Sequence, residues 1–69
     1  MKLRVHYLNQ HDKATWYEFM VPDSDVRPTL DNLGRTVSSG ALVVVDQDDA
    51  FSFAFPASRF LRIEKVKEQ

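Results

Sequence analysis

The side chains of this chain that could bind a metal ion fall into two groups, and the first is an acidic run. Asp46, Asp48 and Asp49 place carboxylates close together, as in part of a calcium-binding loop. Such a loop also needs a glycine at its sharp turn and a bidentate glutamate at its twelfth position. The run has no glycine, and the twelfth position from Asp46 is Ala57. We therefore predict a solvated turn over Asp46–Asp49, and no calcium site.

The second group consists of His6, His11 and Asp12. Two imidazoles and a carboxylate could bind zinc, but a catalytic zinc site needs three ligands that are held rigidly. His11 lies in a polar, turn-prone stretch that offers no such rigidity. We predict exposed histidines and no metal.

Groups that could support catalysis are also few. The chain has no cysteine, which excludes a thiolate ligand, a cysteine nucleophile and a disulfide. Ser38 and Ser39 lie at the end of a predicted helix, without the strained turn that exposes a serine nucleophile. The only glycines are Gly34 and Gly40, so there is no glycine-rich loop to bind phosphate. We predict that the protein is not an enzyme and has no cofactor.

A nucleic-acid site is the alternative function that the sequence suggests. Lys2, Arg4 and His6 alternate along the first predicted strand and share one face of it, with Arg62 farther across the sheet and Trp16 beside them. Single-strand binders stack bases on aromatic side chains and hold phosphates with flanking cations. The net charge of −1 opposes the attraction to phosphate that normally dominates such binding.

The first function that we predict is protein binding. If Tyr17 and Phe19 face the helix, neighbouring side chains of the same strand are left on the open face of the sheet. Trp16, Met20 and Phe60, with Val43 and Val45 as further candidates, would then form an apolar patch of a kind that monomers seldom expose. A protein partner or a second copy of the chain, as in a homodimer, would bury this patch, with Trp16 as the anchor.

Length and composition restrict the class of protein. With 69 residues and 43% hydrophobic content, residues 1–69 form one small domain. No stretch approaches the ~18 apolar residues of a membrane span, and the charged start is not followed by the apolar segment of a signal peptide. We expect a cytoplasmic protein without a membrane partner.

The elements that must position these residues follow from periodicity. Alternation predicts the first two strands, and apolar residues at Val26, Leu30, Leu33 and Val37 predict a helix that ends at Gly40. The predicted strands are Lys2–Leu8, Ala14–Val21, Leu42–Val45, Phe51–Phe55 and Phe60–Val66.

The uninterrupted apolar run Leu42–Val45 is typical of a strand that is covered on both faces, so we place it at the centre. Hairpin connections then give an antiparallel five-stranded sheet with spatial order 2-1-3-4-5 and one helix on one face, an α+β fold with ββαβββ order. The alternative is a small, partly closed barrel in which the fifth strand meets the second.

Overall fold

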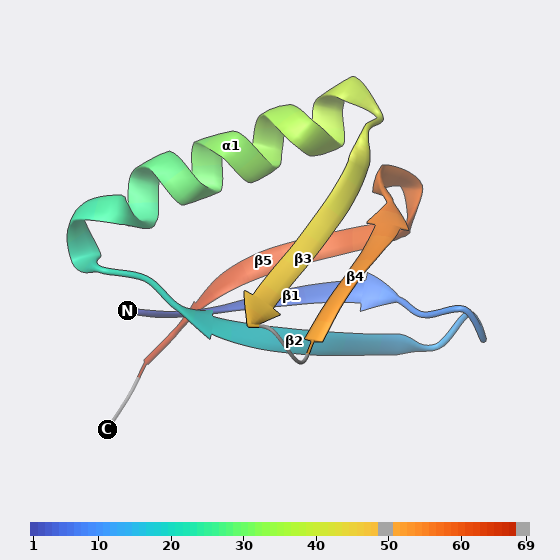
Figure 1. Ribbon diagram of the computed structural model, residues 1–69, viewed down its shortest axis with the longest axis horizontal. Coiled ribbons are helices and arrows are strands. Elements are labelled where there is room, and N and C mark those ends of the chain that lie inside the picture. The colour runs from blue at the N-terminus through green and yellow to red at the C-terminus, as the bar shows by residue number, and fades with distance from the viewer. Residues whose placement is uncertain (49–50, 68–69) are drawn as a thin grey trace.

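The computed structural model describes residues 1–48 and 51–67, and for residues 46–48 and 51–52 it describes the backbone alone. Within these residues the strands form two antiparallel sheets, one of three strands in the order β2-β1-β5 and one of two strands, β3 and β4 (Figure 1). The elements in chain order are β1 (Lys2–Leu8), β2 (Ala14–Met20), η1 (Asp23–Asp25), α1 (Val26–Ser39), β3 (Leu42–Asp48), β4 (Phe51–Pro56), η2 (Ala57–Arg59) and β5 (Phe60–Val66). The predicted α+β class and element order are confirmed.

The single five-stranded sheet with order 2-1-3-4-5 is not confirmed. β1 pairs with β2 on one side and with β5 on the other, so neither of its edges is left for β3. β5 matches β1 in charge, because Glu64 lies opposite Arg4 in the register, and such cross-strand pairs stabilise a sheet. The barrel alternative does not form either, since β5 pairs with β1 and the described strands do not close.

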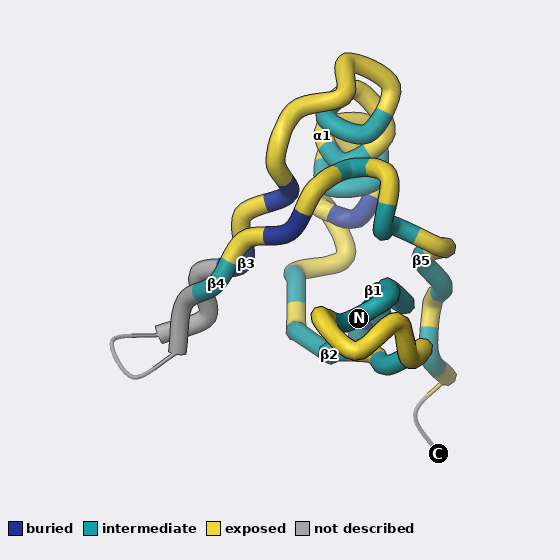
Figure 2. Tube along the Cα trace, turned by 90° about the vertical axis from the view of Figure 1, so that its right-hand side faces the viewer, coloured by how far each residue is buried: buried dark blue, intermediate teal, exposed yellow. Residues whose placement is uncertain are grey.

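The prediction that Leu42–Val45 is covered on both faces is wrong. Val43 and Val45 are 3% and 4% exposed, whereas Leu42 and Val44 are 60% and 69% exposed. The β3–β4 hairpin crosses the three-stranded sheet as a separate layer, so the sheet covers only one of its faces (Figures 1 and 2). The backbone of β3 also continues to Asp48, into the segment predicted as a turn.

β1 takes the central position that was expected of β3. Leu3 and Val5 are fully buried, and both project toward the hairpin and the helix. Aromatic rings fill the space between the two sheets: the ring centres of Tyr7 and Phe55 are 4.7 Å apart in a stacked arrangement, and Tyr17 meets Phe53 edge-on at 5.7 Å. These contacts hold the hairpin against the larger sheet.

α1 packs one stripe against this core. Val26 is buried, and Leu33 and Val37 contact the buried cluster of Val5, Val43, Val45 and Phe55. Gly40 ends the helix with φ 76°, and its N–H donates to the carbonyl oxygens of Thr36 and Val37. The predicted end of the helix is therefore confirmed. In the described chain, no helix combines the length and the apolar character that a membrane crossing requires.

The turn between β1 and β2 is fixed by hydrogen bonds. Oδ1 of Asn9 accepts from the backbone N–H groups of His11 and Lys13, at 2.8 and 3.1 Å. Nη1 of Arg59 donates to the carbonyl oxygen of Asn9 and to Oδ1 of Asp12, each at 2.8 Å. Asp12 has φ 60°, a left-handed conformation that aspartate tolerates better than most residues. Asp12 is thus an ion-pair partner of Arg59.

Candidate binding surfaces

One surface is the side of the three-stranded sheet that faces away from α1 and the hairpin, which we call the open face. The register places on it alternate residues of all three strands: Lys2, Arg4, His6, Trp16, Glu18, Met20, Arg62, Glu64 and Val66. The four residues expected to bind nucleic acid, Lys2, Arg4, His6 and Arg62, are therefore brought together, and Trp16 lies opposite His6.

Carboxylates lie among these cations. Oε2 of Glu18 accepts from Nε and Nη2 of Arg4, at 3.1 and 2.8 Å. Oε1 of Glu64 lies 2.6 Å from Nε2 of His6, 3.8 Å from Nη1 of Arg4 and 3.9 Å from Nη2 of Arg62. The positive charges of the open face are thus largely matched by charges of the protein itself.

Glu64 is the centre of this network. The hydrogen bond from His6 lowers the pKa of Glu64, partial desolvation opposes that effect, and the charges of Arg62, His6 and Arg4 lower the pKa further. Glu64 is therefore ionised at neutral pH, so Nε2 of His6 must be the donor in their contact.

Two of the three residues expected to bind protein share the open face. Trp16 and Met20, both on β2, are 50% and 59% exposed. The guanidinium carbon of Arg4 lies 5.3 Å from the centre of the Trp16 ring, a cation–π arrangement.

Phe60 lies on the other side of the sheet. The β1–β5 register shifts between His6, which faces Arg62, and Tyr7, which faces Phe60. This bulge turns Phe60 toward the core, where it packs against the buried cluster. Val43 and Val45 are buried and are also absent from the open face.

A second surface is the outer side of the β3–β4 hairpin, which sequence reasoning missed. The register places Leu42 opposite Pro56 and Val44 opposite Ala54, and all four are exposed. We call these four residues the hairpin outer face. Its signal in the sequence is the apolar run Leu42–Val45, of which the structure covers only one face.

A third surface is a groove of about 380 Å³ beside β3, which we call the β3 groove. Its walls come from three elements: Tyr17 and Phe19 of β2, Thr29, Asn32, Leu33 and Thr36 of α1, and Leu42, Val43 and Val44 of β3. Among the described residues that line it, none is charged. The groove joins an unpaired side of the hairpin to the edge of the aromatic core.

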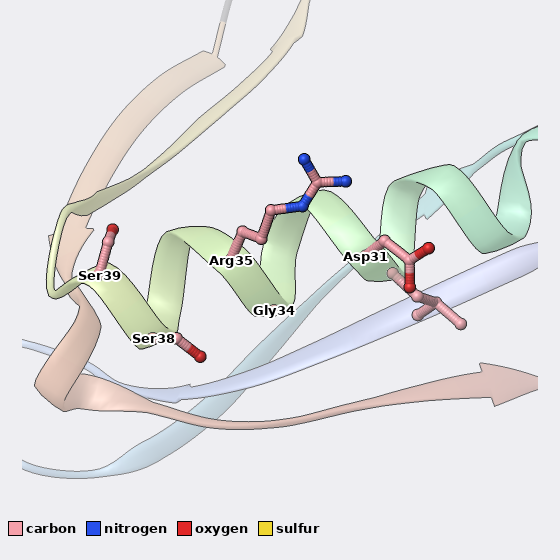
Figure 3. A pocket seen from close by; sticks show the side chains of 6 residues that line it. Asp31, Gly34, Arg35, Ser38 and Ser39 are labelled. Carbon is pink, nitrogen blue, oxygen red and sulfur yellow. The ribbon is translucent and has the colours of Figure 1, made fainter.

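Two other depressions are weaker candidates for a binding site. One, of about 690 Å³, follows α1 past Asp31, Gly34 and Arg35, and the labelled side chains point apart and not toward a common centre (Figure 3). The other, of about 530 Å³, lies between the β1–β2 turn and β4, next to Arg59. The guanidinium of Arg59 is already engaged by Asn9 and Asp12.

The residues considered for metal binding lie apart. His6 contacts Glu64 on the open face, His11 is exposed in the β1–β2 turn, and Asp12 binds Arg59. Within the described part of the chain, no three metal-binding side chains lie close enough to hold an ion. The carboxylates of Asp46–Asp49 lie outside the described residues.

The chain matches no protein-family model, no curated protein and no solved structure.

Proposed function

We propose that the protein is a non-catalytic module that binds another protein. The observation that carries this proposal is the exposure of Leu42 and Val44, at 60% and 69%, in the part of β3 that is apolar on both of its faces. The chain covers one face of β3 with its own core, and the other face forms a contiguous apolar surface with Ala54 and Pro56. Such surfaces mark sites of protein contact.

Trp16 and Met20 supply a second apolar contact on the opposite side of the molecule. Tryptophan is the residue most enriched among binding hot spots, because a large ring with one polar atom loses much water on contact. Half of the Trp16 side chain is exposed, and the contact with Arg4 helps to fix its orientation. A partner that covers Trp16 would also desolvate the Arg4 guanidinium.

We propose a non-catalytic function because the histidine–carboxylate pair, His6 and Glu64, lies on the face of a sheet. His6 and Glu64 belong to the open face, while the three depressions described above are lined by other residues. Catalytic pairs normally act in a concave site that holds the substrate and excludes water.

Site-specific photo-crosslinking in the native host tests the proposal. With p-benzoylphenylalanine in place of Val44, we expect one or a few discrete protein adducts. The same group in place of Ser38, which is exposed on α1 and does not line the β3 groove, is the control and should give none. Equal adduct patterns from the two positions would refute the proposal, and an adduct of twice the chain mass would identify a second copy as the partner.

A nucleic-acid function is the second candidate, favoured by one observation. Lys2, Arg4, His6 and Arg62 share the open face with Trp16. Glu18 and Glu64 lie among them, and the protein as a whole has a net charge of −1. Titration of Trp16 fluorescence with oligothymidylate at low salt separates the two functions. We expect no change, whereas quenching that salt reverses would favour nucleic acid.

A further inference from the structure

The β3 groove lies along a strand edge that has no partner in the described chain. β3 pairs with β4 on one side, and Leu42, Val43 and Val44 line the groove on the other. Because Pro56 has no N–H, its pairing with Leu42 must be of the non-hydrogen-bonded type. The alternation then directs the backbone N–H and C=O groups of Leu42 and Val44 away from β4, toward the groove.

The opposite wall of the groove suits a peptide backbone. α1 contributes Thr29, Asn32 and Thr36 from successive turns, and these side chains can donate to and accept from a main chain. The hydroxyl of Thr36 donates to the carbonyl oxygen of Asn32 at 3.0 Å, which leaves its oxygen as an acceptor. Below these polar groups, Tyr17, Phe19 and Leu33 form an apolar floor.

We propose that the β3 groove binds an extended, uncharged segment of a partner protein, which adds to the hairpin as a third strand next to β3. This inference rests on the proposed protein-binding function and names the chemistry of the partner. The backbone of the segment pairs with Leu42 and Val44, and its apolar side chains enter at every second position, between the rings of Tyr17 and Phe19 and the side chain of Leu33.

The lining determines what kind of segment fits. A charged side chain would lose its water against walls that contain no opposite charge among the described residues, so the segment must be uncharged where it is enclosed. Residues of β3, α1 and β2 line the groove, so an added strand would contact all three elements. In a second folded copy, each strand is flanked by the other layers of that copy, and these layers would have to enter the groove with it. We therefore assign the groove to a segment of another protein.

Selection of random peptides of about twelve residues on the intact protein provides the probe. We expect the enriched peptides to be apolar at alternate positions and uncharged in their central part. Their affinity is then compared between Leu42→Pro and Leu42→Ala, both of which remove the exposed leucine side chain. Only proline removes the N–H that points into the groove, and it is tolerated at the first position of an edge strand.

We expect Leu42→Pro to weaken binding about tenfold more than Leu42→Ala, because one main-chain hydrogen bond is lost and its acceptor is left buried. Asn32→Lys, which places a charge in the groove, should also weaken binding about tenfold. The matched variant Ser38→Lys adds the same charge to an exposed position of α1 that does not line the groove, and should leave binding unchanged. Circular dichroism and thermal midpoints show whether all four variants fold.

Three results would overturn the inference: peptides enriched with helical spacing, equal affinities for the proline and alanine variants, or no enrichment at all. If the chain self-associates and Leu42→Pro abolishes this self-association, the groove binds a second copy, and the inference is likewise overturned. The proposed function is judged separately, since a Val44 crosslink that survives Asn32→Lys keeps protein binding while it excludes strand addition. If the protein without further substitutions gives no Val44 adduct at all, both proposals are refuted.

Discussion

Nε2 of His6 lies 2.6 Å from Oε1 of Glu64, and this contact joins residues 58 positions apart in the chain. In the β1–β5 register His6 faces Arg62 and Arg4 faces Glu64, so the His6–Glu64 contact is diagonal. It links the last strand to the first, and Arg4 lies in the same network, with Nη1 3.8 Å from Oε1 of Glu64. Because β2 and β5 occupy both edges of β1, β3 does not pair with β1.

Replacing His6 with alanine should raise the pKa of Glu64 toward its ordinary value, because the hydrogen bond from His6 is the largest cause of its depression. The depressed pKa stabilises the fold above the ordinary glutamate pKa of about 4.3, and that stabilisation is lost as the pH falls through the lowered value. The variant should therefore lose less stability on acidification than the wild type does. An NMR titration of the Glu64 carboxyl carbon measures the shift.

His11→Ala is the control for this prediction, because His11 is exposed in the β1–β2 turn and has no contact with Glu64 among the described interactions. An unchanged Glu64 midpoint in His6→Ala would contradict the assigned cause.

Val45→Ala and Val44→Ala test the one-sided burial of β3. Val45 is 4% exposed and Val44 is 69% exposed, although the two residues are identical and adjacent. Val45→Ala should lower the free energy of unfolding by about 2 kcal/mol, since two buried carbon atoms are lost at about 0.8 kcal/mol each and a small cavity is left. Val44→Ala should change it by less than about 0.5 kcal/mol. Urea denaturation followed by circular dichroism measures both, and equal losses would restore the prediction of a strand covered on both faces.

The elements set by local sequence were predictable. Alternation located β1 and β2 but left open which face of β2 is buried, and Gly40 marked the end of α1, since only glycine readily adopts the left-handed conformation there. Each of these signals is contained in a few consecutive residues, so no knowledge of distant partners was needed.

Strand order was not predictable in the same way. An apolar run such as Leu42–Val45 shows that two apolar faces exist, but the covering layer of one face can belong to another molecule. Phe60 was predicted on the wrong side of the sheet, because a bulge beside Leu61 reverses the side on which it lies. This bulge arises from the pairing of β5 with β1. The groove beside β3 depends on how the hairpin crosses the sheet, which again is set by tertiary packing.

Gly40→Ala and Gly34→Ala should change stability in opposite directions. No atom lies within 4 Å of a Cβ built at either glycine, so a methyl group meets no clash at either position. Gly40 has φ 76°, and alanine there should cost about 1 kcal/mol from backbone strain. Gly34 is an exposed residue inside α1, where alanine should stabilise by about 0.5–1 kcal/mol. Thermal unfolding of the two variants compares them directly, and equal shifts would contradict the left-handed assignment of Gly40.

Tyr17 should make the protein sensitive to alkali. Its ring lies 5.8 Å from that of Tyr7 and 5.9 Å from that of Phe19, and burial, with a smaller effect of Tyr7, raises the pKa of Tyr17 to about 12. An unfolded chain ionises near 10, so the neutral Tyr17 stabilises the fold fully below pH 10, and this contribution is lost as the pH rises toward 12. After allowance for solvent screening of a half-buried group, the contribution is about 1 kcal/mol. Urea denaturation below pH 10 and near pH 11 should therefore show a smaller alkaline loss in Tyr17→Phe than in the wild type. Ultraviolet titration of Tyr7→Phe should retain the late ionisation, and its persistence in Tyr17→Phe would show that another group is responsible.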